Sequence, residues 1–104
     1  MSDTPKTVCK AHEIETGKAK IIHIDDQSIA VFRLGDKEFS AIDNTCPHAG
    51  GSLGEGYLDG AIVTCPWHGW QFNVKTGACE TVPQDRIRHY KAKRDGDDIL
   101  VQLS

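Results

Sequence analysis

The sequence has little that would indicate a membrane, a nucleic acid or an export pathway. It holds no apolar run approaching the length of a membrane span, and residues 1–10 lack the apolar stretch of a secretory signal. Acidic residues outnumber basic ones by 15 to 12, so the net charge of −3 gives no overall basic field for binding nucleic acid. We therefore expect a cytoplasmic protein that binds neither nucleic acid nor a membrane.

The chain is also too short for a large enzyme with separate cofactor and substrate domains. Its 104 residues, 38% of them hydrophobic, supply one modest core. No internal repeat, low-complexity tract or linker divides it. We expect a single domain over residues 1–104.

Charged side chains are scarce in the middle of the chain. Residues 40–79 contain seven of the ten glycines, three of the four cysteines and both tryptophans, but only four charged residues, Asp43, Glu55, Asp59 and Lys75. This composition differs from that of the flanks. It indicates an inserted, site-bearing subdomain at about residues 43–80 within a plain scaffold.

The flanking segments favour strands. β-Branched and apolar residues alternate with turn signals at residues 25–28, 35–36 and 95–97, and only residues 11–15 suggest a helical turn. The fold class we predict is all-β and antiparallel. The predicted strands span residues 20–24, 29–34, 38–42, 61–64, 71–74, 88–94 and 98–103.

Two short motifs carry the chemistry of this sequence. Cys46-Pro-His48 and Cys65-Pro-Trp-His68 each place a thiol and an imidazole on one loop beside a strand, and 16 residues separate the motifs. In a cytoplasmic protein, cysteines indicate metal or redox chemistry before disulfides. Two such loops could turn four ligands toward one metal centre.

This four-ligand set leaves two metal centres open. Zinc accepts two Cys and two His, but its usual pattern groups the two cysteines on one knuckle and the two histidines on a helix. Here each loop contributes one of each, which suits a binuclear iron–sulfur cluster with two thiolates on one iron and two imidazoles on the other.

The spacing C-x-H, 16 residues, C-x-x-H resembles that of the Rieske iron–sulfur proteins, and residues 50–56 resemble the family's loop between the ligand pairs. The resemblance implies a small antiparallel β-sandwich or barrel-like Rieske fold with an inserted cluster-binding subdomain of two loops. It also implies one [2Fe-2S] cluster, with Cys46 and Cys65 on one iron and His48 and His68 on the other.

Within that family the chain is similar to the soluble ferredoxins of multicomponent oxygenases. The resemblance implies a non-enzymatic, monomeric one-electron carrier that passes electrons from a flavin reductase to a terminal oxygenase. It is also similar to the small subunit of assimilatory nitrite reductases, which is the alternative function. A structural zinc module is the third possibility.

Other reactive or aromatic residues have simpler interpretations. Cys9 and Cys79 belong to no ligand pattern and are expected to pack beside strands. His12, His23 and His89 have no paired cysteine and are expected to be solvated. We expect the surface over the cluster to include Trp67, Tyr57 and Leu53.

Overall fold

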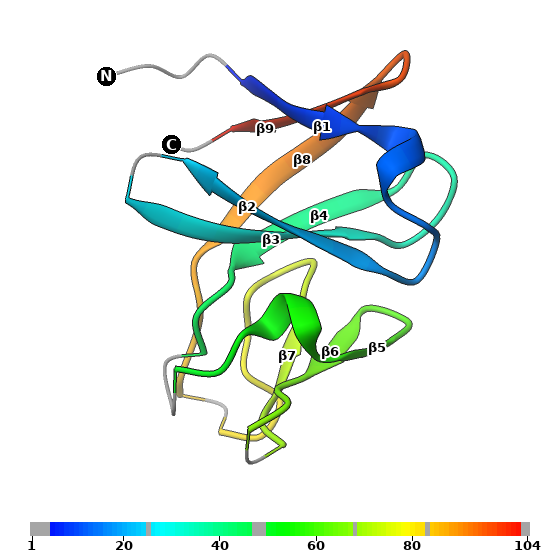
Figure 1. Ribbon diagram of the computed structural model, residues 1–104. Coiled ribbons are helices and arrows are strands. Elements are labelled where there is room, and N and C mark those ends of the chain that lie inside the picture. Colours follow the sequence, from blue (N-terminus) through cyan, green and yellow to red (C-terminus); the bar gives the residue numbers. More distant parts are fainter. Residues whose placement is uncertain (1–4, 25, 47–49, 68, 83, 103–104) are drawn as a thin grey trace.

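The computed structural model of the protein describes residues 5–24, 26–46, 50–67, 69–82 and 84–102. Figure 1 shows an upper part formed by the strands of the two chain flanks and a lower part formed by the middle of the chain. The described residues include nine strands and two short 3₁₀ helices. None of these helices is long and apolar enough to span a bilayer.

The upper part is a six-stranded antiparallel sheet in the order β1-β9-β8-β4-β3-β2. The strands curve around a common core in a barrel-like arrangement (Figure 1). Their bounds are β1 Lys6–Lys10, β2 Ala19–Ile24, β3 Gln27–Arg33, β4 Phe39–Asp43, β8 His89–Asp95 and β9 Asp98–Gln102. The all-β prediction is confirmed.

The lower part is a three-stranded antiparallel sheet in the order β5-β6-β7. It lies between β4 and β8 in the chain, within the segment whose composition indicates an insertion. Its strands are β5 Tyr57–Asp59, β6 Ile62–Thr64 and β7 Gln71–Asn73, and a 3₁₀ helix, η2 Leu53–Glu55, precedes it.

Two strands were not predicted, and one predicted turn is too long. β1 carries a lysine at each end and has a bulge between Thr7 and Cys9, so it lacks a clear apolar alternation. β5, with the sequence Tyr-Leu-Asp, contains no β-branched residue and has two exposed side chains, so it has no run of strand-favouring residues. The predicted turn at 25–28 is too long because Gln27 and Ser28 belong to β3, whose ladder with β2 continues to the pair Ile24–Gln27.

The two faces of the six-stranded sheet bury two different cores, because successive side chains of a strand alternate between faces. Inside the barrel, Val31 and Ala41 pack with Tyr90, Ile99 and Val101. The opposite face contributes to a second core, which also contains buried residues of the middle segment. Its buried members are Ala30, Phe32, Ile42, Cys46, Leu53, Val63, Cys65, Phe72, Val74, Cys79 and Ile87.

A polar contact also joins the sheet to the middle segment. Ser40 of β4 is buried and donates its hydroxyl proton to the carbonyl oxygen of Val74. The ring of His89 lies 2.9 Å from the same hydroxyl oxygen, from Nε2 to Oγ. The three-stranded sheet is therefore held to the barrel by both apolar packing and hydrogen bonds.

Candidate metal centre

The first ligand loop follows β4 and closes on itself. The backbone N–H of Cys46 donates to the carbonyl of Gly51 at 2.9 Å, and the N–H of Gly50 donates to the carbonyl of Cys46 at 2.8 Å. Thr45 and Ser52 form an isolated antiparallel bridge at the base of the loop. Residues 45–46 are thus held against residues 50–52, with Cys46 fixed at the point where the loop begins.

Asn44 anchors this loop, a role that the sequence analysis missed. Its side-chain nitrogen donates to the Ser52 hydroxyl at 2.9 Å, and its side-chain oxygen accepts the N–H of Gly54 at 2.7 Å. Asn44 is 7% exposed. A buried amide at one end of a loop with hydrogen-bond partners at the other end fixes the distance between the two ends. An asparagine directly after a strand otherwise reads only as a turn residue.

The second ligand loop follows β6. The N–H of Cys65 donates to the carbonyl of Trp70 at 2.7 Å, which holds these two residues together at the base of the loop. Gly69 has a φ of +76°, a conformation that side chains with a Cβ rarely adopt. Both loops therefore begin with a cysteine at the end of a strand and return through a glycine-containing segment.

The two loops bring the thiols of Cys46 and Cys65 together in the second core. The side chains are hydrogen-bonded to one another, and the residues are 1% and 2% exposed. All four cysteines of the chain are free thiols. Two buried, unbridged thiols that converge from separate loops are suited to bind one metal ion as thiolates.

The groups around Cys65 have opposite effects on the pKa of its thiol, and the net effect is a raised pKa. Burial raises the pKa of this thiol, the backbone N–H of Trp67 lowers it by donating to the sulfur, and the Cys46 thiol raises it again. The raised pKa favours the neutral thiol at Cys65 until a metal cation takes the place of its proton. The Trp67 amide is already in place for the resulting thiolate.

Gly51 lies close to the side chains of Cys65 and Trp67. A Cβ added at residue 51 would lie 2.8 Å from the Cys65 sulfur and 3.1 Å from Cγ of Trp67. Gly51 is itself buried. The absence of a side chain here allows the first loop to approach the sulfur of the second.

The other two predicted ligands, His48 and His68, lie outside the described residues. Within the parts of the chain that are described, no group of three or more His, Cys, Asp or Glu residues converges on a metal-sized site. The structure therefore brings together the two predicted cysteines, and the assignment of the histidines stays a prediction.

Comparison with known protein families decides what this pair of loops belongs to. The model of the Rieske [2Fe-2S] domain matches residues 4–91. The chain belongs to the Rieske family. Its cofactor is accordingly one [2Fe-2S] cluster, and the two paired, buried thiols fit a thiolate-bound iron of such a cluster.

Relatives of known role resemble this Rieske chain over nearly its whole length. It is 37% identical to the biphenyl dioxygenase ferredoxin subunit of Pseudomonas sp. (strain KKS102) over 98 residues, 92% of this chain and 89% of that protein. It is 30% identical to a chain in the complex of reduced oxygenase and oxidised ferredoxin in carbazole 1,9a-dioxygenase, with a TM-score of 0.86 over 97% of this chain and 94% of that one.

A further solved structure shares the Rieske fold at lower identity. The putative NADH-dependent nitrite reductase small subunit from Mycobacterium tuberculosis superimposes with a TM-score of 0.90, covering 100% of this chain and 98% of that one, at 23% identity. This likeness concerns the fold alone.

The remaining sequence predictions divide into correct and incorrect ones. Cys9 and Cys79 are buried as expected, and Trp67 and Tyr57 are exposed at 56% and 71%. Leu53 is not part of the surface, because this first residue of η2 is fully buried in the second core.

The three unpaired histidines also differ. His12 and His23 are exposed, as predicted, and His12 pairs with Asp97 through Nδ1 at 2.8 Å. The prediction for His89 is wrong, because its ring is half-buried against Ser40. Burial lowers the pKa of His89, which favours the neutral ring.

Proposed function

We propose that the protein is a one-electron carrier whose [2Fe-2S] cluster is held by Cys46 and Cys65 on one iron and by His48 and His68 on the other. The observation that supports this most directly is the convergence of two buried thiols from the loops of a Rieske fold. When bound, the cluster takes up and releases one electron. Two imidazoles in place of two thiolates make the centre less negative, so an added electron is less disfavoured.

The residues around Cys65 have a defined part in this role. The N–H of Trp67 donates to the sulfur, and such hydrogen bonds stabilise negative charge on a thiolate. Burial of both cysteines keeps water from the sulfurs. The chain thereby holds two thiolates in a dry setting with a backbone dipole directed at one of them.

The surface next to this loop suits transient docking. Trp67 and Tyr57 are the large exposed apolar side chains of the described residues, and residues 40–79 carry few charges. Exposed aromatic side chains in a segment of low charge can bury area against a partner with little desolvation cost. The proposed partners are a flavin reductase as donor and a terminal oxygenase as acceptor, as the relatives' names suggest.

The proposed carrier is one Rieske domain over residues 1–104, with its cluster-binding insertion at about 43–80, and acts as a monomer in the cytoplasm. The three-stranded sheet supports the insertion because it shares a core with the barrel. An electron carrier needs no further active site, which accords with the small size of the chain.

The ligand assignment is tested with His48→Ala and His68→Ala, and His23→Ala serves as the matched control because His23 is an exposed histidine of β2. Each ligand variant is expected to lose iron and acid-labile sulfide, whereas the control retains both. Full iron and sulfide contents with an unchanged visible spectrum in either ligand variant would show that the assignment is wrong.

The carrier role is tested by stopped-flow mixing of the dithionite-reduced protein with the oxidised terminal component of a biphenyl-type dioxygenase. Rapid reoxidation of the carrier with matching reduction of the oxygenase is the expected result. The alternative function is a small subunit of an assimilatory nitrite reductase, a class of protein that shares this fold. Stable co-purification with a sirohaem reductase and no electron transfer to the oxygenase would support that alternative. Family membership does not favour a structural zinc module.

A further inference from the structure

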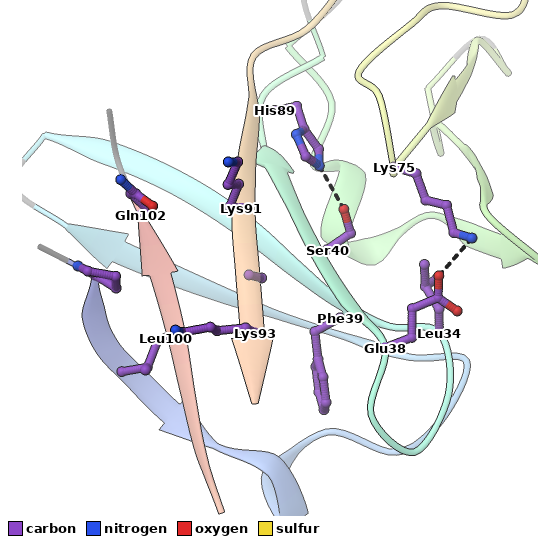
Figure 2. Close-up of a pocket in the computed structure, with 12 residues that line it drawn as sticks. Leu34, Glu38, Phe39, Ser40, Lys75, His89, Lys91, Lys93, Leu100 and Gln102 are labelled. Atoms are coloured by element: carbon purple, nitrogen blue, oxygen red, sulfur yellow. Dashed lines mark hydrogen bonds and ion pairs between the residues drawn. The ribbon is translucent and has the colours of Figure 1, made fainter. Parts of the chain in front are cut away.

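A groove of about 490 Å³ lies against β4, β8 and β9, and neither Cys46 nor Cys65 lines it. Figure 2 shows it from the side of β8, with side chains of these strands and of Lys75 around it. The groove has no part in the electron-carrier role proposed above. Its volume falls within the range of about 300–1,000 Å³ that is typical of small-molecule sites.

Strand register places four groove residues on one face of the sheet. Lys93 lies opposite Leu100 and Lys91 lies opposite Gln102 in the β8–β9 ladder. Directly paired residues share a face, as do residues two apart in a strand. Figure 2 shows the Lys93 side chain reaching toward Leu100. One wall of the groove thus carries two lysine side chains beside the apolar side chain of Leu100.

The charges of the groove are unbalanced. Lys91 and Lys93 form no hydrogen bond or ion pair with any residue that the structure describes, whereas Lys75 pairs with Glu38 at 2.7 Å. Glu38 is the one acidic residue among those lining the groove. Three lysines against one glutamate give a local positive charge in a protein whose net charge is −3. This wall therefore lacks a negative group.

The groove is also lined by apolar side chains that are only partly buried. Leu100 is half-buried and, among the described residues, belongs to neither of the two cores. Pro5 and Leu34 line the same space and are also partly exposed. A bare inorganic anion would leave these carbons in water, so an occupant with an apolar body fits better.

The polar groups at the inner end are already satisfied by the protein. Ser40 gives its proton to the Val74 carbonyl, so its oxygen accepts from Nε2–H of His89. The Ser40 hydroxyl and the Nε2–H of His89 therefore both have partners within the protein. Recognition of a polar head falls to the free ammonium groups of Lys91 and Lys93.

From this arrangement we propose that the groove is a binding site for a small amphipathic carboxylate. The carboxylate lies between Lys91 and Lys93, and the apolar body covers Leu100 and Pro5. The combination of two unpaired ammonium groups with a partly exposed apolar wall distinguishes this ligand class from both neutral lipids and simple anions.

The test uses octanoate as the probe and the cluster-loaded full chain in low-salt buffer. Calorimetric titration is expected to show one saturable site, at least ten-fold weaker for acetate and for octan-1-ol, because each lacks one half of the ligand. Added salt is expected to weaken octanoate binding by screening the lysines. Amide chemical shifts of residues 91, 93 and 100 are expected to move on titration, which locates the site without any substitution.

A double variant, Lys91→Gln with Lys93→Gln, is expected to weaken octanoate binding at least ten-fold. The matched control is Lys18→Gln with Lys37→Gln, which removes the same charge from exposed positions outside the groove and is expected to change the affinity less than two-fold. The visible spectrum of both variants should equal that of the parent, because no substituted residue lies near the cysteines. Equal weakening in both variants would overturn the proposal. So would a lack of saturable octanoate binding, or binding of hexaglutamate in its place.

Discussion

Gly51 and Cys65 belong to different ligand loops, and the sulfur of Cys65 lies beside the position that a side chain at residue 51 would occupy. A Cβ at residue 51 would lie 2.8 Å from the Cys65 sulfur, closer than real Cβ atoms approach any neighbour. The conformation of Gly51 is not left-handed, so the requirement for glycine here is one of space alone. Approach of the first loop to the sulfur of the second depends on this missing methyl group.

Gly51→Ala is therefore expected to displace Cys65 or Trp67 and to lower the iron and sulfide content of the purified protein. Gly50→Asn is the control: Gly50 has a φ of +75°, which asparagine tolerates, and open space around its Cβ position. Visible absorption and iron analysis of both variants check the prediction. A Gly51→Ala protein with full cluster content would contradict it.

Asn44→Ala is expected to loosen the first ligand loop, because the substitution removes both side-chain hydrogen bonds of Asn44 and leaves the Gly54 N–H without its partner. The expected loss is about 1–3 kcal/mol of unfolding free energy, with faster cluster loss to a chelator. Asn73→Ala is the control, since the Asn73 oxygen also accepts a backbone N–H, from Lys75, but in an exposed turn. Equal chelator sensitivity in the two variants would show that Asn44 does not position the loop.

The four cysteines are expected to separate into two pairs on substitution. Cys46→Ser and Cys65→Ser should abolish the visible spectrum. Cys9→Ala and Cys79→Ala should preserve it, at an ordinary packing cost of about 0.5–3 kcal/mol each. Cys79 has a further contact, since the N–H of Val82 lies 3.3 Å from its sulfur. A colourless Cys9→Ala/Cys79→Ala protein would reveal an unrecognised ligand.

His89 is expected to make the fold less stable in mild acid. Burial lowers its pKa in the folded protein, whereas in the unfolded chain it titrates near about 6.5. Below that pH the unfolded chain binds a proton that the folded chain binds more weakly. The stabilisation is therefore fully present above about pH 6.5 and is lost as the pH falls toward the lower folded value.

The measurement is the urea midpoint as a function of pH for the parent, for His89→Gln and for the exposed-histidine control His23→Gln. His89→Gln should flatten the fall in the midpoint below pH 6.5, because glutamine can still donate to Ser40 but does not titrate. Identical pH profiles of the parent and His89→Gln proteins would rule out this contribution.

Trp67→Gln is expected to slow electron transfer to a partner protein more than it changes the cluster. Trp67 is 56% exposed, and its backbone N–H, which the substitution keeps, is the group that bonds to Cys65. The second-order rate of reoxidation by an oxygenase component measures docking, and the visible spectrum measures the cluster. An unchanged rate would mean that the partner docks elsewhere.

Much of the fold follows from local sequence patterns. Strand residues 29–34 and 98–103 are nearly continuous apolar and β-branched runs, and short turns such as Gly35-Asp36 fix their antiparallel pairing. The C-x-H and C-x-x-H spacing resembles that of the Rieske family, and the match of the family model over residues 4–91 confirms this resemblance. Cys46 and Cys65 were therefore predictable as a pair.

Other features depend on residues far apart in the chain, so only the tertiary structure decided them. Leu53 and His89 looked like surface residues, and each is covered because the middle segment folds back on the outer face of β4 and β8. Asn44 has an ordinary turn sequence, and its importance comes from the two sides of the loop it joins. The groove arises because β8 and β9 place Lys91 and Lys93 beside Leu100, a pairing that strand register sets and composition does not.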